Sequence, residues 1–378
     1  MKQGNKWYCI FFCAVLLAFC IANIATPQKA FSDNENRSLM QFPVPSAESI
    51  LSGDFMSDFE SYSTDQFIGR DFFIRVKALS ERASGKKENN GVYFAKNDFL
   101  IQKPPALDRR ILNTNITALQ KLKSLGTFDI KTVLVPTAYE IEKEELPAYA
   151  YQPVQREIVA LTSSLLNPSG INLIDPYPVL REHRQEHLYY RTDHHQTAYG
   201  GYYTYQVIAQ ALGITPYAMD AFTVREMSHD FYGTTWSEAT LPYIPPDTID
   251  LFEPRFDIRF TTEFVGENKK IDGLYDMEAL RQKDKYVMYL GGNHPITKVT
   301  SSLQNGKKLA VFKDSYAHNI VPFLANHYQE IYMIDPRYYN LDPVAYLQEN
   351  KITDVLVLYS ASNFASDTNL FKISAYLK

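Results

Sequence analysis

Short apolar strands alternate with helical segments through most of the chain, and this pattern constrains the fold more than any other feature of the sequence. Strand-like runs occur at 132–135, 171–174, 286–290, 309–312, 330–334 and 354–358, and helical spacing occurs at 154–166, 196–212, about 316–328 and 343–350. Strands that alternate with helices usually pair in parallel through right-handed crossovers. The sequence therefore predicts an α/β domain with a mostly parallel sheet flanked by helices.

Regions before and within this alternation have other patterns. Helices are predicted at 46–62, 70–82 and 107–125, and a hairpin is predicted near 91–101. Residues 213–285 break the alternation, with Pro245-Pro246 and a strand-like run at 258–262. We interpret residues 213–285 as an insertion with β character.

The N-terminus carries an uncharged apolar run, residues 7–25, after Lys2 and Lys6. A helix of about 19 residues can span a hydrocarbon core, and the two lysines favour a cytoplasmic N-terminus. We expect a signal-anchor at 1–25, a polar linker at 26–45 and an extracytoplasmic domain at 46–378 on a single-pass protein. Cleavage after Ala22-Asn23-Ile24-Ala25 is the alternative, and it would release a secreted protein.

Charge and cysteine content exclude several classes of protein. The net charge is −5 and no long basic stretch occurs, which argues against nucleic-acid binding. All three cysteines, Cys9, Cys13 and Cys20, lie in the apolar run. The rest of the chain therefore has no disulfide and no cysteine metal site. The 27 tyrosines suit either a sugar-binding surface or half-buried strands.

Ser315 lies where an apolar strand ends and a helix is predicted to begin, after Lys313 and Asp314. A serine at this edge of a parallel sheet lies where α/β active sites cluster, and the helix start offers N–H groups to a developing oxyanion. Asp314 or Ser315 as an ordinary N-cap is the competing interpretation.

Asp193 and His195 lie in a loop that enters the helix predicted at 196–212. A serine nucleophile needs a base, and the base needs an orienting carboxylate, so this pair can supply both. Capping of the helix is the alternative. His183 and His187 lie upstream at a spacing typical of zinc ligands, and with Asp193, His194 and His195 they suggest a metal cluster. Because no HExxH glutamate accompanies them, we favour a solvated helix face and predict no metal.

Three further residues follow predicted strands. Asn293 follows Gly291-Gly292 after one strand, Arg337 follows another, and Asn363 follows the last. A side-chain amide at Asn363 can donate to an oxyanion, and Arg337 can face the same site. With His194 and Tyr316, these residues are our candidates for oxyanion or substrate contacts. The glycines can equally form a tight turn.

In this order, the motifs resemble those of the DHHW proteins, bacterial extracytoplasmic relatives of the alginate O-acetyltransferase domain in the SGNH hydrolase superfamily. The resemblance rests on Glu35-Asn36-Arg37-Ser38-Leu39, Gly91-Val92-Tyr93, Thr192-Asp193-His194-His195, Gly291-Gly292-Asn293-His294-Pro295, Lys313-Asp314-Ser315-Tyr316-Ala317 and Asp335-Pro336-Arg337-Tyr338-Tyr339. It implies an SGNH-like, circularly permuted domain in which Asp193 orients, His195 is the base and Ser315 attacks. Gln196 replaces the expected Trp, and Lys313 replaces the glycine of a Gly-Asp-Ser motif.

The function implied by this resemblance is acetyl transfer to a cell-surface or exported polysaccharide, such as a cell-wall glycopolymer, without a cofactor. A membrane-bound O-acyltransferase is the implied partner. The alternatives are a carbohydrate acetyl esterase, a non-catalytic polysaccharide-binding or scaffold protein, and a metal-dependent phosphoesterase that uses Asp193, His194 and His195.

Overall fold

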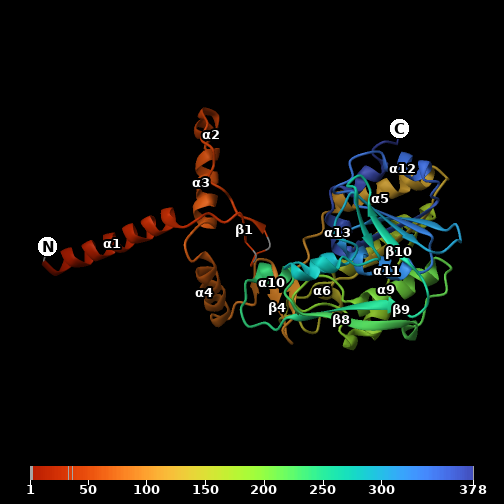
Figure 1. Ribbon diagram of the computed structural model, residues 1–378, viewed down its shortest axis with the longest axis horizontal. Coiled ribbons are helices and arrows are strands. Elements are labelled where there is room, and N and C mark those ends of the chain that lie inside the picture. The colour runs from red at the N-terminus through yellow and green to blue at the C-terminus, as the bar shows by residue number, and fades with distance from the viewer. Residues whose placement is uncertain (1–2, 33, 36, 378) are drawn as a thin grey trace. The chain divides into compact units, whose positions relative to one another are not determined.

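The computed structural model describes residues 3–32, 34–35 and 37–377, which form two compact units (Figure 1). The N-terminal unit comprises residues 1–89 and 237–243, and the sheet unit comprises residues 90–236 and 244–378. The division into an anchor, a linker and a domain from residue 46, made from the sequence, stays a prediction.

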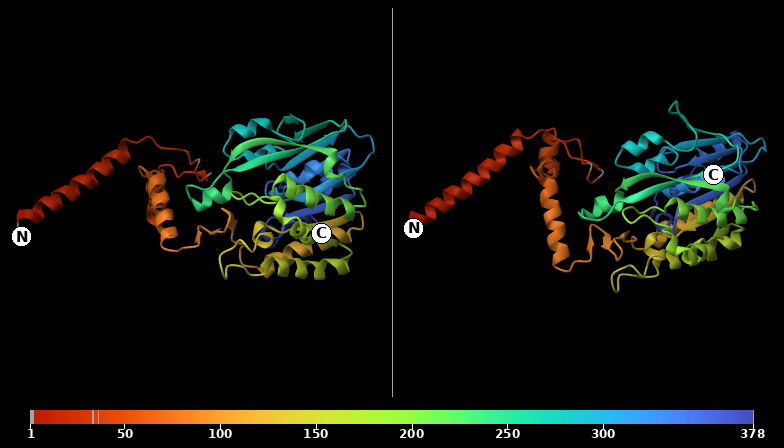
Figure 2. Two further views of the ribbon diagram at one scale, coloured as in Figure 1. Left: turned by 90° about the horizontal axis from the view of Figure 1, so that it is seen from below. Right: turned by 60° about the horizontal axis from the view of Figure 1, so that its bottom comes forward.

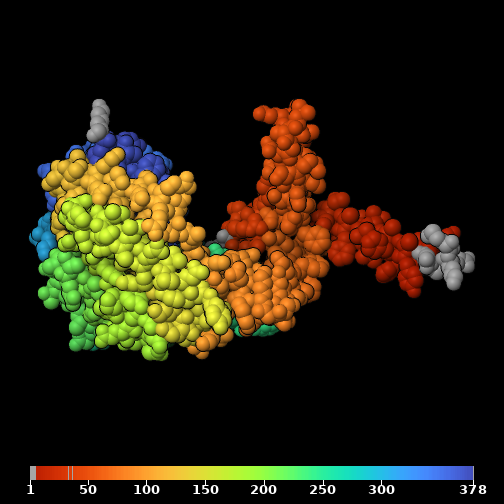
Figure 3. Space-filling view, turned by 180° about the vertical axis from the view of Figure 1, so that it is seen from behind, coloured from red at the N-terminus to blue at the C-terminus, as the bar shows by residue number. Residues whose placement is uncertain are grey.

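The N-terminal unit begins with the long helix α1 (Gln3–Ala25). Its segment Lys6–Ala25 is long and apolar enough to cross a membrane, which fits a signal sequence or an anchor. The unit continues with β1 (Phe31–Ser32), β2 (Arg37–Ser38), α2 (Ala47–Ser52), α3 (Asp54–Asp65), α4 (Arg70–Ala83) and β3 (Glu88–Asn89). The helix predicted at 46–62 is divided by Gly53, whose φ of 89° is left-handed. In the space-filling view α2 and α3 form a narrow, exposed rod (Figure 3).

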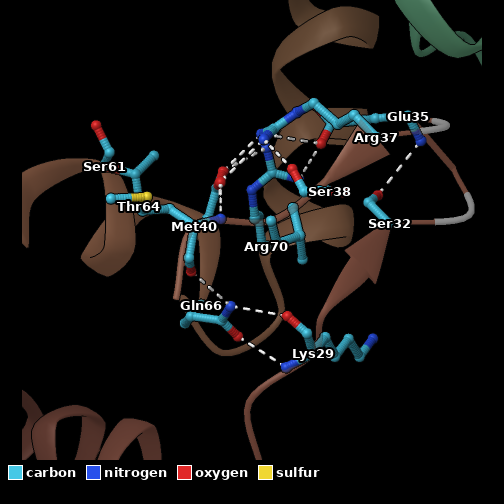
Figure 4. Close-up of polar contacts among 12 residues, drawn as sticks. Lys29, Ser32, Glu35, Arg37, Ser38, Met40, Ser61, Thr64, Gln66 and Arg70 are labelled. Atoms are coloured by element: carbon cyan, nitrogen blue, oxygen red, sulfur yellow. Dashed lines mark hydrogen bonds and ion pairs between the residues drawn. The ribbon is translucent and has the colours of Figure 1, made fainter. Parts of the chain in front are cut away.

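Ion pairs order much of the segment that we predicted as a polar linker. Arg37 binds both oxygens of Asp65 at 2.9 and 2.6 Å, and Arg70 binds Glu35 at 2.6 Å (Figure 4). The Gln66 amide donates to the carbonyls of Lys29 and Met40. These contacts tie the β1–β2 hairpin to the end of α3.

The sheet unit contains an eight-stranded sheet in the order β11-β10-β12-β14-β13-β15-β6-β7. Its strands are β6 (Asp129–Val135), β7 (Asn172–Ile174), β10 (Phe260–Phe264), β11 (Lys269–Asp272), β12 (Ile296–Ser301), β13 (Lys308–Lys313), β14 (Glu330–Ile334) and β15 (Asp354–Ser360). The strands from β14 to β7 are parallel, whereas β12, β10 and β11 pair antiparallel. The predicted mostly parallel α/β sheet is thereby confirmed.

Helices cover both faces of this sheet (Figure 2). The described α-helices of this unit are α5 (Arg109–Ser124), α6 (Ala138–Ile141), α7 (Val154–Leu166), α8 (Tyr177–Glu182), α9 (Ala198–Ala211), α11 (Val321–Leu324), α12 (Pro343–Glu349) and α13 (Ala361–Ser366), while α10 (Thr234–Ala239) is divided between the two units. Leu309 and Val311 pack in the core with α9, whereas Ala310 and Phe312 pack in the core with α5 and α7. Because side chains alternate along a strand, a strand buried on both faces is apolar throughout. The yellow segments in Figure 3 include α5 and α7.

Three predicted elements differ from the structure. Residues 286–290 were predicted as a strand, but 285–288 form the 3₁₀ helix η5 (Lys285–Met288), and β12 is the strand that the prediction missed. The run is apolar because Tyr286, Met288 and Tyr289 enter a small separate core with Phe231 and Ile249. An apolar run of this length does not distinguish a strand from another buried segment.

The predicted helix at 316–328 is instead the 3₁₀ helix η6 (Ser315–Asn319) followed by the short α11, with Pro322 in its first turn. The predicted insertion is also divided. The strands β8 (Phe222–Phe231) and β9 (Asp247–Pro254) form a separate hairpin, whereas β10 and β11 extend the main sheet.

Candidate active site

The carboxyl ends of the parallel strands bring the candidate residues to one edge of the sheet. Ser315 follows β13 by two residues and begins η6, while Asn363 lies in α13 directly after β15. Arg337 follows β14. Parallel strands place the residues after them at a common edge, which is where α/β proteins bind ligands.

Asp193, His195 and Ser315 form a continuous chain of hydrogen bonds. The Nδ1 of His195 lies 2.6 Å from Oδ1 of Asp193, and its Nε2 lies 2.7 Å from Oγ of Ser315. Asp193 and His195 are buried, whereas Ser315 is half-buried. A carboxylate that orients an imidazole, which in turn contacts a hydroxyl, is the geometry of an activated nucleophile.

Backbone donors from two segments hold the Asp193 carboxylate. The N–H of His195 donates to Oδ1 at 2.9 Å, and the N–H of Thr234 donates to Oδ2 at 2.8 Å. Burial favours a higher pKa for Asp193, but the charges of His195 and His194 and the hydrogen bonds from His195 and Thr234 outweigh it. The pKa of Asp193 therefore lies well below its ordinary value, and the carboxylate is charged.

Gly233 leaves room for this carboxylate. A Cβ at residue 233 would lie 2.3 Å from Cβ and 2.4 Å from Oδ2 of Asp193. The glycine is therefore required by close approach. Neither Gly233 nor Thr234 was among the candidates taken from the sequence, because they lie about 40 residues from Asp193.

The ring of Tyr286 stacks on the imidazole of His195, and this residue was also absent from the candidates taken from the sequence. Gln196, which occupies the position of the Trp expected from the resemblance, is fully buried. Its side chain bonds the hydroxyls of Tyr189 and Thr204. The aromatic face beside His195 comes instead from a residue beyond β9, at a position that no local motif identifies.

Asp314 organises the turn that carries Ser315. Its carboxylate accepts hydrogen bonds from the N–H groups of Tyr316 (3.0 Å) and Ser360 (2.9 Å) and from the Asn363 amide (2.8 Å). Asp314 is thus both an N-cap, as the competing interpretation held, and a link to α13. One N–H of Asn363 is committed to Asp314, and an amide carries a second.

Arg337 and Asn293 meet Lys313 in a cluster around the buried carboxylate of Asp335. Lys313 Nζ lies 3.0 Å from Asp335, 2.9 Å from Asn293 Oδ1 and 2.7 Å from Nε2 of His318. Arg337 donates to Asp335 and, at 3.1 Å, to Asn293. Burial lowers the pKa of Lys313 to about 8, although Asp335 opposes the shift. Asn293 therefore serves as an acceptor for these two cations.

His194 and Tyr316 both lie beside the His195 ring and contact each other. The His194 and His195 ring centroids are 3.8 Å apart, and the Tyr316 hydroxyl donates to the His194 carbonyl. Burial raises the pKa of Tyr316 well above its ordinary value, so it is a neutral donor.

Among the described residues, Asp193, His194 and His195 are close enough together to hold a metal ion. Both ring nitrogens of His195 already contact Asp193 and Ser315, so a metal bound through His195 would break one of these contacts. His183 and His187 are not members of this group: His183 contacts Glu186, and His187, the C-cap of the 3₁₀ helix η2 (Arg184–Glu186), lies 3.7 Å from Asp247. The predicted His183–His187 helix face does not form.

The fold and this hydrogen-bonded Asp-His-Ser arrangement define a class of α/β protein with a serine at a strand end. The model of the "DHHW protein" family matches residues 110–334, more than half of the chain, and the chain therefore belongs to the DHHW family. No curated protein matches the sequence.

Solved structures show the same fold. A DHHW family protein from Eubacterium siraeum DSM 15702 is 23% identical, with a TM-score of 0.61 over 76% of this chain and 96% of that chain. Bacillus cereus PatB1 with a sulfonyl adduct is 20% identical, with a TM-score of 0.61 over 75% of this chain and 99% of that chain. A second Bacillus cereus PatB1 structure is 20% identical, with a TM-score of 0.60 over 73% and 97% of the two chains.

Proposed function

We propose that this protein transfers an acyl group, most simply acetyl, to a hydroxyl of a cell-surface or exported polysaccharide through a covalent Ser315 ester. The observation that carries the proposal is the chain of contacts from Asp193 through His195 to Ser315, at 2.6 and 2.7 Å. The apolar helix α1 supports a location at the membrane, with the sheet unit outside the cytoplasm.

The reaction needs only groups that this site contains. His195 Nε2 accepts the Ser315 proton while Oγ attacks the carbonyl carbon of the donor ester. The N–H of Ser315, at the start of η6, has no acceptor within that helix, and the second Asn363 N–H is a further donor for the oxyanion. His195 then protonates the leaving alkoxide, and the acyl group remains on Ser315.

The second half of the reaction reverses these roles. His195 removes the proton from an acceptor hydroxyl, whose oxygen attacks the acyl-Ser315 carbonyl. Ser315 leaves and recovers its proton from His195. A sugar hydroxyl as acceptor gives a transferase, and water gives an acetyl esterase. The resemblance to alginate O-acetyltransferases favours the sugar and implies a membrane-bound O-acyltransferase as the source of the acyl group.

Acylation of the full chain in detergent tests the proposal. The protein is incubated separately with p-nitrophenyl acetate and phenylmethylsulfonyl fluoride, and its intact mass is measured. We expect an increase of about 42 Da with the acetate, as for an acyl-enzyme, and a sulfonyl adduct with the fluoride. Ser315→Ala should abolish both adducts, whereas the exposed control Ser164→Ala should retain them.

A folded wild-type protein that forms neither adduct would contradict the covalent mechanism. That result would favour the alternative of a polysaccharide-binding or scaffold protein. Release of p-nitrophenol from p-nitrophenyl phosphate that depends on an added metal and persists in Ser315→Ala would favour the metal-dependent phosphoesterase instead.

A further inference from the structure

Two hollows in the sheet unit flank the turn that carries Ser315. The first has a volume of about 340 Å³ and includes Tyr316 in its lining, and the second has a volume of about 230 Å³ and includes Asp314. Asn363 lines both hollows. Ser315 itself lines neither hollow, but each hollow includes one of its chain neighbours, Asp314 or Tyr316.

The first hollow combines apolar walls with hydroxyl groups. Pro104, Pro105 and Tyr139 provide apolar surface, and Thr137 and Ser360 provide hydroxyls. Sugar rings present C–H faces as well as hydroxyls, so a mixed lining of this kind suits them. Tyr139 is firmly placed, because its hydroxyl donates to the Ala150 carbonyl at 2.8 Å.

The second hollow is lined almost entirely by polar groups. Ser366, Thr368 and Asn369 lie beside Asp367 and Arg337. Asp367 is held by the N–H of Asn369 at 2.6 Å, so this loop is ordered by its own hydrogen bonds. Its hydroxyl, amide and charged groups can exchange hydrogen bonds with sugar hydroxyls.

Exposed residues border each hollow. Lys103 and Pro105 are exposed at the first, and Ser366 and Thr368 are exposed at the second. Each hollow alone is at or below the lower end of the usual range for a small-molecule site, about 300–1,000 Å³. The two together, which share Asn363, provide a longer binding surface that includes both chain neighbours of the reactive serine.

We propose that these two hollows form one polysaccharide-binding cleft, in which sugars on both sides of the modified unit are bound and an internal unit of the chain faces Ser315. The proposal rests on the proposed acyl transfer and adds that the acceptor is an extended oligosaccharide or polymer. A single sugar or a chain end would occupy only one hollow.

The test measures binding of the full-length Ser315→Ala protein in detergent to an array of defined glycans, from monosaccharides to hexasaccharides of several polymers. We expect binding to at least one hexasaccharide series to be about tenfold tighter than to its disaccharide, a difference of about 1.4 kcal/mol. Thr368→Trp, which fills the second hollow, should reduce this ratio, and the matched control Ser164→Trp on α7 should preserve it.

Three results would overturn the inference. These are equal binding of disaccharides and hexasaccharides, an unchanged ratio in a folded Thr368→Trp protein, and no binding to any glycan. If wild-type protein still forms the acetyl-Ser315 adduct in those cases, the proposed acyl transfer stands and only the cleft is refuted. Absence of that adduct would refute the proposed function separately.

Discussion

The phenol ring of Tyr286 lies parallel to the imidazole of His195, with ring centroids 3.8 Å apart and an interplanar angle of 7°. The Tyr286 hydroxyl also donates to the Ser315 carbonyl at 3.3 Å. One residue therefore covers the proposed base and contacts the backbone of the proposed nucleophile. This contact restricts rotation of the imidazole and excludes water from one of its faces.

Tyr286→Ala should lower kcat for p-nitrophenyl acetate by about ten- to a hundredfold, because a misaligned base loses much of its contribution to proton transfer. Tyr286→Phe keeps the ring and loses only a long hydrogen bond, so its kcat should stay within about threefold of wild type. Steady-state kinetics with circular dichroism as the folding control distinguish the two. Equal activity of a folded Ala variant and the Phe variant would show that stacking has no role.

Asp193→Asn should reduce turnover by about 10⁴-fold, because the amide cannot stabilise the imidazolium in the same way. The low pKa of Asp193 also predicts a pH effect. The charged Asp193 carboxylate stabilises the folded protein above pH 3.8, the pKa of this carboxyl group in the unfolded chain. This stabilisation is lost as the pH falls toward the lower pKa of the folded protein. Urea unfolding should therefore show wild type losing its advantage over Asp193→Asn below about pH 4. A constant difference down to pH 2 would contradict this.

Gly233→Ala should displace the Asp193 carboxylate, since the new Cβ would lie 2.4 Å from Oδ2. We expect activity to fall by about a hundredfold or more, as for small displacements of catalytic groups. The double variant with Asp193→Asn should be no less active than Asp193→Asn alone, because both changes act through one side chain. If the two losses of activity add, Gly233→Ala acts on a group other than the Asp193 carboxylate.

Asp335→Ala should destabilise the sheet unit by about 3–5 kcal/mol, because it leaves Lys313 and Arg337 without their shared buried counter-charge. Lys313→Met should cost less than about 1.5 kcal/mol at pH 7, since Arg337 still pairs with Asp335 and a buried ammonium is no longer desolvated.

The pH dependence of stability isolates the contribution of the Lys313 charge. The Lys313 pKa is about 8 in the folded protein and 10.5 ordinarily, so the unfolded chain holds the proton more tightly between these values. Wild type should therefore gain stability relative to Lys313→Met as pH rises from about 8 to 10.5. Urea unfolding at several pH values measures the difference. A fall over that range would refute the assigned shift.

Full-length protein expressed in a bacterial host should fractionate with membranes and keep residues 1–25, as shown by intact mass. Introducing an aspartate at Leu16, in the middle of α1, should reduce membrane association because a carboxylate costs about 2.5–3.5 kcal/mol at a bilayer centre. Recovery of a soluble form that begins after Ala25 would instead establish the cleaved alternative.

Local sequence determined the parallel core of the sheet and the location of Ser315. Strands such as 309–312 are apolar at every position because both faces are buried, so their pattern is visible without knowledge of their partners. The Asp193-His195 segment was likewise recognisable, since the proposed orienting carboxylate and the proposed base lie two residues apart.

Only the tertiary structure decided which distant residues complete the site. Tyr286 belongs to a run that was predicted as a strand. In the structure it packs in the small core with residues of β8 and β9 and stacks on His195. Thr234 and Asn363 reach Asp193 and Asp314 across 41 and 49 residues. Such contacts depend on how loops close between elements, and hydrophobic periodicity carries no information about that closure.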